Sequence, residues 1–387
     1  MVKLSFLCYG IENMKEKIVK LNKKKPAFAK ASAGKKRVIV GLSGGVDSSV
    51  AAALLVKQGY EVIGVFMRNW SEDVGDFSCS WTEDLEDARR VAQLLGIRFY
   101  VWNFEEEYKR EVIGYFFKEY QAGRTPNPDV MCNREIKFKL FLDKALSFGA
   151  DYVATGHYAR IVEKNKHYEL HRGKDPNKDQ SYFLCTLGQD QLKHVLFPIG
   201  DYLKPAIRKL AKQYGLLTFD KPDSQGICFI GEIDVKDLLR RNVKMKPGKV
   251  FDESGKLLGK HDGLPLYTIG QRGGLEIGGN GPYYVISKDE KKNSILVSNN
   301  PNDPLLWRKE CMINELTWTR PDIIIADKLE VAIRYRHPAE LAKVKIINKD
   351  KFSLDFIKAQ RAITPGQLAV FYKGTELLGS GVIDKVL

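Results

Sequence analysis

The sequence RVIVGLSGGVDSS, residues 37–49, decides the fold class of this 387-residue chain. Residues 37–42 form a short apolar run rich in β-branched side chains, which predicts a buried strand. The turn SGGVDSS follows at 43–49, and the segment AAALLVKQGY has helical composition with a glycine stop at Gly59. A strand that passes through a glycine-rich turn into a helix is typical of α/β proteins.

The same alternation continues along the chain to about residue 158. Further strands are predicted from apolar runs at 61–70, 97–104 and 150–158. Helices are predicted between them at 82–96, 105–121 and 133–148. Strands that alternate with helices indicate a parallel sheet wrapped by helices.

The pattern changes after about Pro205. Short helices surround the loop DKPDSQGICFIG, and from about residue 265 glycine-rich turns separate β-like runs at 282–288, 294–299, 329–337, 342–348, 352–357, 368–374 and 376–383. These runs predict a small β-barrel. The expected plan is a basic, disordered extension (1–36), a catalytic α/β domain (37–204), a small central domain (205–275) and a C-terminal β-barrel (276–387).

Charge and apolar content limit the class of protein. Hydrophobic residues make up 44% and charged residues 28%, as in ordinary globular proteins. Residues 1–36 hold ten lysines against two glutamates and so carry +8 of the net charge of +14. No run is long enough to span a membrane, and the first residues fit neither a secretory signal nor a transit peptide. We therefore expect a cytoplasmic protein with a mildly basic body, compatible with a polyanionic partner.

The loop at 43–49 has the features of a phosphate site. Adjacent glycines let backbone N–H groups approach an anion, and the following helix N-terminus adds partial positive charge. Asp47 could hold a metal ion that bridges phosphates. The chain has no GxxxxGK[ST] string, and this loop lacks GxGxxG spacing, so the P-loop and dinucleotide-binding motifs do not account for it.

Two of the six cysteines occupy loops of unusual composition. Cys132 ends the loop TPNPDVMC, and we expect Asp129 to cap the helix that follows and the helix dipole to favour the Cys132 thiolate. Asp129 could instead move protons. Cys228 lies in SQGICFIG, among apolar neighbours. The other four cysteines, Cys8, Cys79, Cys185 and Cys311, are assigned to packing or to inert surface. No CxxC pair occurs, which excludes the usual zinc-ribbon spacing.

The loop SGGVDS resembles that of the PP-loop ATP pyrophosphatases, whose fold is similar to adenine nucleotide alpha hydrolases. A closer resemblance, to the bacterial tRNA-specific 2-thiouridylase family, covers the chain from about Lys36 to its end. It rests on the strings GRTPNPDVMCNREIKF, ATGHYAR, KDQSYFLCTL, SQGICFIG, GQRGGL, RYRH and TPGQLAVFY. The extension at 1–36 departs from the family, so its role stays open.

The resemblance implies a reaction and a set of site residues. ATP would adenylate the 2-oxygen of the wobble uridine in tRNAs with Lys-, Glu- or Gln-type anticodons, and sulfur from a persulfide on Cys228 would replace that oxygen. Cys132 would release sulfide or form a transient disulfide, with Asp129 as general acid/base. ATP would bind Gly41, Leu42, Ser43, Gly44, Gly45, Val46, Asp47, Ser48, Met67 and Gly156, with Mg²⁺ at Asp47. The tRNA would contact Asn127, Pro128, Asp129, Lys178, Asp179, Gln180, Arg334 and Tyr335.

Two other functions compete with this one. Another PP-loop ligase, acting on a small molecule, would need neither cysteine, and an RNA-binding module without catalysis would not need SGGVDS, NPDVMC and GICFIG together. The sequence leaves open the sulfur donor (a cysteine desulfurase or a sulfur-relay protein), the tRNA preference, the oligomeric state and the order of sulfide release and attack.

Overall fold

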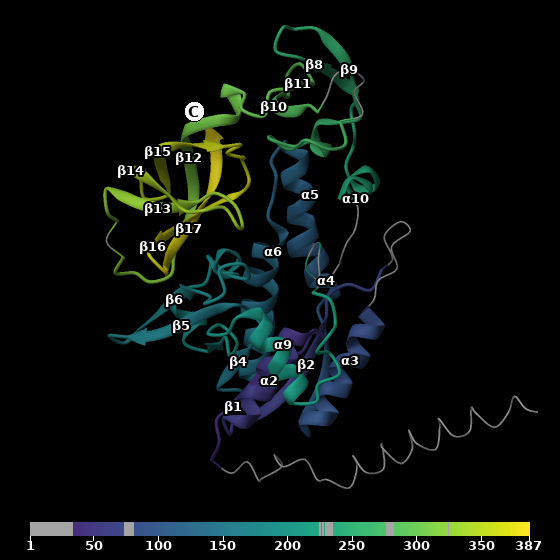
Figure 1. Cartoon of the computed structure of the whole chain (residues 1–387), viewed down its shortest axis with the longest axis vertical. Coiled ribbons are helices and arrows are strands. Elements are labelled where there is room, and N and C mark those ends of the chain that lie inside the picture. Colours follow the sequence, from purple (N-terminus) through teal and green to yellow (C-terminus); the bar gives the residue numbers. More distant parts are fainter. Residues whose placement is uncertain are drawn as a thin grey trace, which may run out of the picture.

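The computed structural model describes residues 34–72, 81–223, 226, 228, 235–275, 282–323 and 325–387. Most of the expected basic extension therefore lies outside the described residues. Figure 1 shows an α/β domain at one end of the molecule and two β-rich parts at the other, with the C-terminus in the barrel. No helix in the described ranges is long and apolar enough to cross a membrane.

A five-stranded parallel sheet forms the centre of the α/β domain, as the sequence predicts. Its order is β3-β2-β1-β4-β7, and every pairing is parallel. The strands are β1 (Arg37–Gly41), β2 (Glu61–Arg68), β3 (Arg98–Asn103), β4 (Tyr152–Ala154) and β7 (Val195–Leu196). Because all carboxyl ends lie along one edge, the loops that follow β1, β2 and β4 meet there.

Helices cover both faces of this sheet because alternate strand residues point in opposite directions. Val38 and Val40 pack with α2 (Val46–Lys57), α3 (Trp81–Leu95) and α9 (Lys204–Gln213). Ile39 lies in a second core cluster that the helices between residues 105 and 147 share. With both faces covered, β1 is buried from Val38 to Gly41, which explains why these four residues are apolar.

Two long helices in the second cluster contain π-helical segments. The predicted helix at 105–121 runs as α4 (Glu105–Tyr108), the π-segment η1 (Lys109–Ile113) and α5 (Gly114–Gln121). The predicted helix at 133–148 starts earlier, as α6 (Pro128–Met131), continues as the π-segment η2 (Cys132–Leu140) and ends as α7 (Phe141–Ser147). π-Helical turns are rare and often lie at functional sites.

Six strands close the C-terminal β-barrel, which confirms the predicted barrel. They follow the order β12-β15-β14-β13-β16-β17, and β12 also pairs with β17. Their bounds are β12 (Trp307–Trp318), β13 (Lys328–Ala332), β14 (Glu340–Asn348), β15 (Lys351–Arg361), β16 (Leu368–Lys373) and β17 (Glu376–Val386). The hairpin β5 (Ala159–Lys164) and β6 (His167–Arg172) of the α/β domain pairs with β17, so the two domains share hydrogen-bonded strands.

A four-stranded sheet lies between these domains in sequence. Its order is β10-β11-β8-β9, from β8 (Gly248–Phe251), β9 (Leu257–His261), β10 (Tyr284–Asp289) and β11 (Ser294–Ser298). The sheet therefore runs past residue 275, the expected end of the central domain, because β10 and β11 pair with β8 and β9 and not with the barrel. The remaining helices are η3 (Ser181–Leu184), α8 (Gln189–Leu192), α10 (Val235–Asn242), η4 (Leu264–Leu266) and η5 (Pro304–Leu306).

Candidate active site

The glycine-rich loop joins β1 to α2 at the carboxyl edge of the parallel sheet. Gly44 adopts φ of 76°, and a methyl group added there would lie 2.3 Å from the backbone oxygen of Asp84. Ser48 Oγ accepts a hydrogen bond from the backbone N–H of Ser43 at 3.2 Å and donates one to Gly45 O at 3.1 Å. These two hydrogen bonds hold the loop in a tight turn. The first N–H groups of α2 have no intrahelical partner, so they are suited to bind an anion.

The residues expected to bind ATP come together at this edge. Gly41 through Ser48 run from the end of β1 into the first turn of α2, Met67 lies near the end of β2, and Gly156 follows β4. A methyl group on Gly156 would lie 2.6 Å from the backbone nitrogen of Ser48. Only glycine fits at such a close approach, so the loop after β4 packs directly on the glycine-rich turn.

Asp47, the predicted metal ligand, is already paired inside the protein. Lys204 Nζ lies 2.8 Å from both carboxylate oxygens of Asp47, and the Tyr158 hydroxyl donates to Oδ1 at 2.7 Å. The same ammonium lies 2.7 Å from Asp223 Oδ1. The described part of the chain holds no group of three or more acidic, His or Cys side chains that fits a metal ion. The loop geometry fits a triphosphate, but these contacts do not make Asp47 an open magnesium ligand.

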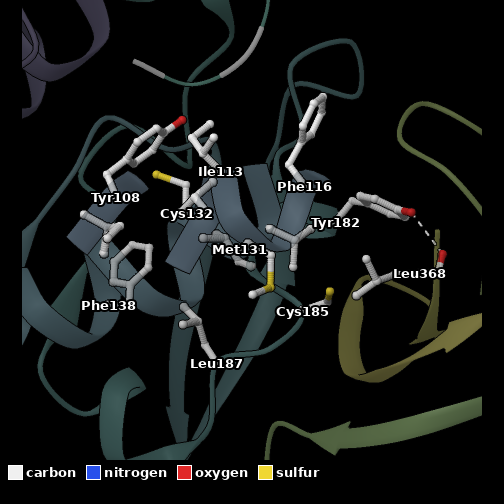
Figure 2. Close-up of a cluster of buried hydrophobic side chains, with 14 of the residues drawn as sticks. Tyr108, Ile113, Phe116, Met131, Cys132, Phe138, Tyr182, Cys185, Leu187 and Leu368 are labelled. Carbon is white, nitrogen blue, oxygen red and sulfur yellow. Dashed lines mark hydrogen bonds between the residues drawn. The ribbon is translucent and has the colours of Figure 1, made fainter. Parts of the chain in front are cut away.

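Cys132 and Cys228 meet although they lie in distant loops. Cys132 is fully buried at the start of η2, with its sulfur directed towards Tyr108 (Figure 2), and a hydrogen bond joins its side chain to that of Cys228. The Cys228 N–H donates to Asp129 Oδ1 at 3.0 Å, and the Tyr108 hydroxyl donates to Cys228 O at 2.6 Å. Both cysteines are free thiols, and Cys228 is partly exposed. The structure therefore gathers the three residues predicted to be catalytic.

The cysteine whose surroundings favour the thiolate form is Cys228. The prediction that the helix dipole favours a thiolate at Cys132 is wrong. The hydrogen bond from Cys132 lowers the pKa of Cys228 to about 7, against the effect of burial and with help from the Lys137 ammonium. Burial raises the pKa of Cys132 well above its ordinary value, and the neighbouring Cys228 raises it further. Because Cys132 is four residues into the helix and out of water, desolvation outweighs the helix dipole.

Asn127, and not Asp129, caps the helix that leads to Cys132. Asn127 Oδ1 accepts a hydrogen bond from the Val130 N–H at 3.2 Å, and Pro128 occupies the first helical position. This corrects the predicted cap and explains how Asp129 is released to bind the Cys228 backbone. Burial raises the pKa of Asp129, although the Cys228 N–H and the Lys137 ammonium oppose this effect. A carboxyl group in that environment is suited to proton transfer.

Of the residues expected to contact tRNA outside this loop, Asp179, Arg334 and Tyr335 line a pocket where the α/β domain meets the barrel, whereas Lys178 and Gln180 bond to residues of the α/β domain and its following loop. Lys178 pairs with Asp223, Asp179 accepts from the Gly173 N–H at 2.9 Å, and Gln180 Oε1 accepts from the Tyr158 N–H at 3.0 Å. The ring of Tyr335 packs 4.4 Å from that of Phe183, centroid to centroid. A surface pocket beside them is lined by several basic and aromatic side chains, among them Arg172, Tyr182, Arg334, Tyr335 and Arg336.

Three residues that contact the predicted site residues were not identified from the sequence: Tyr108, Lys137 and Lys204. Lys137 donates a hydrogen bond to the Cys228 side chain, and Lys204 joins Asp47 of the glycine-rich loop to Asp223, five residues before Cys228. Ordinary helical spacing places Lys137 away from Cys132, so only the π-segment could have indicated it.

The remaining described cysteines behave as expected: Cys185 and Cys311 are buried in cores, Cys185 apart from Cys132 in Figure 2. Cys8 and Cys79 lie outside the described residues.

Comparisons with known proteins cover almost the whole chain. Residues 36–232, 236–299 and 308–383 match family models described as a tRNA methyl transferase HUP domain, a tRNA methyl transferase PRC-barrel domain and an aminomethyltransferase beta-barrel domain. The tRNA-specific 2-thiouridylase MnmA of Bacillus velezensis is 50% identical over 353 residues, which is 90% of this chain and 95% of that protein. The protein of the same name in Bacillus subtilis (strain 168) is 48% identical over the same shares.

Likeness to solved structures is weaker. The U34-tRNA thiolase NcsA from Methanococcus maripaludis, solved with its [4Fe-4S] cluster, is 19% identical and covers 59% of this chain and 73% of its own, with a TM-score of 0.34. So low a score carries no argument about fold or activity. The sequence relatives and the family models together indicate where this chain belongs.

Proposed function

The chain belongs to the family of tRNA-specific 2-thiouridylases, and from that premise we propose that Cys228 carries the sulfur, that Cys132 resolves it and that Asp129 moves the proton. The chain is accordingly a tRNA sulfurtransferase that forms 2-thiouridine. The observation that carries the proposal is the meeting of two free thiols and a buried carboxylate, brought together from loops about a hundred positions apart. The family models are described by methyl transfer, but a thiol pair suits sulfur transfer.

Uridine activation takes place at the glycine-rich loop. A carbonyl oxygen leaves poorly, and transfer of AMP from ATP to that oxygen makes it a good leaving group. The close packing at Gly44 and Gly156 supports a triphosphate cradle between β1, β2 and β4. Lys204 already pairs with Asp47, so we propose that a Mg²⁺ ion accompanying ATP would be held chiefly by the phosphates, whose negative charge it would neutralise.

Two routes of sulfur transfer fit the thiol pair. In one, the Cys132 thiol gives its proton to Asp129 and attacks Sγ of the Cys228 persulfide, the S–S bond breaks, and the hydrosulfide that leaves attacks C2 as AMP departs with the 2-oxygen. In the other, the terminal persulfide sulfur attacks C2 first, AMP departs, and Cys132 then attacks Cys228 Sγ, which leaves the sulfur on C2. In both routes the two thiols are oxidised to a disulfide as the transferred sulfur is reduced, so a dithiol reductant must restore them.

The partners follow from this chemistry. A wobble uridine must be unstacked to reach a thiol at the base of a pocket, which favours an anticodon-loop substrate. We propose tRNAs with Lys-, Glu- and Gln-type anticodons as substrates and a cysteine desulfurase or sulfur-relay protein as the donor. We place the reaction in the cytoplasm, where such tRNAs are modified.

Reconstitution tests the proposal. Purified protein is incubated with unmodified tRNA, ATP, magnesium and a cysteine desulfurase, and the digested tRNA is analysed for 2-thiouridine by mass spectrometry. Wild type and the buried-core control Cys185→Ser should form 2-thiouridine, whereas Cys132→Ser and Cys228→Ser should not. Pyrophosphate release on a small-molecule acceptor without any thiouridine would overturn the proposal in favour of a synthetase.

A further inference from the structure

Lys137 reaches the thiol pair because it lies in a π-helical segment. In an α-helix each residue turns by about 100°, so a residue five positions after Cys132 would lie roughly 140° round the helix. In η2 the N–H of Phe141 bonds to Ile136 O, the i to i+5 spacing of a π-helix. The wider turn brings Lys137 nearly above Cys132, and Phe138, with φ of −109° and ψ of 17°, marks the distortion.

Charged and titratable groups from four elements surround Lys137. They are Cys132 of η2, Asp129 of α6, Cys228 of the distant loop and His157 after β4, and Tyr108 of α4 lies beside the same thiols and carboxylate. Burial and the Lys137 charge lower the pKa of His157 well below its ordinary value, so the imidazole stays neutral at neutral pH. Tyr108 also stays neutral because burial raises the pKa of its hydroxyl. Lys137 thus supplies positive charge beside two thiols and a carboxylate.

Partial burial of Lys137 acts to lower the pKa of its ammonium group, but its neighbours reverse that effect. The pKa of Lys137 stands above its ordinary value because the Cys228 and Cys132 sulfurs favour the charged form over the desolvation that opposes it. A cation kept charged against burial requires an anionic partner. The side chain hydrogen-bonded to it is that of Cys228.

We propose that Lys137 is a catalytic residue of sulfur loading, whose ammonium holds the Cys228 sulfur as a thiolate. Building on the proposed function, the Cys228 thiolate, its proton already lost to solvent, attacks the terminal sulfur of a persulfide on the donor protein. The donor S–S bond breaks, a new S–S bond forms on Cys228, and the donor cysteine leaves as a thiolate. Lys137 keeps its proton throughout and stays paired with the reacting sulfur.

The pH dependence of Cys228 alkylation tests this role without tRNA, ATP or a donor. The full chain is treated with iodoacetamide across pH 5–10, and carbamidomethylation of the Cys228 peptide is measured by mass spectrometry. The wild-type midpoint should lie at about 7. In Lys137→Met it should rise by roughly one pH unit or more, so that alkylation at pH 7 falls about fivefold. Lys137→Arg, which keeps the charge, should stay near the wild type.

Lys139→Met is the matched control, because Lys139 lies on the same segment but is exposed and bonds Glu135 at 2.7 Å. Its midpoint should equal that of the wild type. A Lys137→Met midpoint equal to the Lys139→Met midpoint would overturn the proposal and leave Lys137 a merely structural cation. If Lys137→Met does not fold, Lys137→Arg decides: a retained midpoint supports the proposal, and a midpoint one unit higher overturns it. If the wild type forms no 2-thiouridine in the thiolation assay although the alkylation midpoint of Lys137→Met is shifted, that result would count against the proposed function and not against the role of Lys137.

Discussion

The backbone N–H of Cys228 donates a hydrogen bond to Oδ1 of Asp129 at 3.0 Å, across 99 positions of sequence. This contact fixes the loop of Cys228 on the helix that holds Cys132. Asp129 therefore positions Cys228, in addition to the proton transfer that we propose for it. Substitutions at Asp129 can separate the two.

Asp129→Asn should still position Cys228 but should no longer transfer a proton. An amide oxygen still accepts from the Cys228 N–H, so Asp129→Asn should form the Cys132–Cys228 disulfide with a mild oxidant as readily as the wild type. Its thiolation rate should fall by roughly 10²–10⁴ because no proton is transferred. Asp129→Ala should lose both disulfide formation and activity. Wild-type thiolation by Asp129→Asn would contradict proton transfer at this residue.

Gly44→Ala should weaken ATP binding. The added methyl group would lie 2.3 Å from Asp84 O in a backbone with φ of 76°, so the loop must open. We expect at least a tenfold loss of affinity by calorimetry, about 1.4 kcal/mol. Gly59→Ala is the control, since φ is 92° but no atom lies within 4 Å of the added carbon. It should cost about 1–2 kcal/mol of stability and leave ATP affinity unchanged. Equal ATP affinity in the two variants would refute the assignment of this loop.

Lys204→Met should destabilise the protein and change its response to acid. The side chain is 10% exposed and joins two aspartates that are each 29% exposed, so we expect a loss of about 2 kcal/mol in urea unfolding. Lys193→Met, which removes only an exposed pair, should cost less than about 0.5 kcal/mol.

The pH dependence follows from Asp223. Burial would raise its pKa, but Lys178 and Lys204 lower it below the ordinary value. A carboxyl group with a depressed folded pKa contributes stability above its unfolded pKa of about 3.9, and this stability is lost as the pH falls through the folded value. Wild type should lose more stability than Lys204→Met between pH 5 and pH 2. Parallel unfolding curves for the two proteins would exclude the pairing.

Substitution of Arg334 should affect the stability of the barrel, whereas substitution of Arg336 should affect tRNA binding. Arg334 donates to Ala362 O at 2.9 Å, so Arg334→Ala should lower the melting temperature. Arg336 is exposed beside the pocket, 5.1 Å from the Tyr335 ring, and Arg336→Ala should weaken tRNA binding and reduce its salt slope by about one phosphate contact without changing the melting temperature. Unchanged tRNA affinity in Arg336→Ala would count against this face as the RNA contact.

Much of the fold could be predicted because its signals are local. A β-branched run before a double-glycine turn predicts β1 and α2, and alternating runs predict the sheet and the barrel. The partner of each strand is not local: β10 and β11 have ordinary strand sequences, and nothing in them indicates that they pair with β8 and β9. The expected division at residue 275 therefore misplaced them.

At the site, residue types were predictable and their electrostatics were not. The cysteines and Asp129 lie in distinctive loops, but which thiol is ionised depends on burial and on Lys137, neither of which is encoded by neighbours in sequence. The cap was misassigned because Asn127 and Asp129 are both good caps, and only the folded backbone shows that Asn127 accepts from Val130. Lys204 could not be linked to Asp47 across 157 positions.

The account depends most on Cys228 and Cys132 acting as a pair, and a single-turnover experiment tests this most directly. Protein preloaded with persulfide on Cys228 is mixed with ATP and tRNA without reductant, and 2-thiouridine and the Cys132–Cys228 disulfide are counted by mass spectrometry. We predict one disulfide for each thiouridine formed. Thiouridine without that disulfide, or thiouridine formed equally well by Cys132→Ser, would contradict the account.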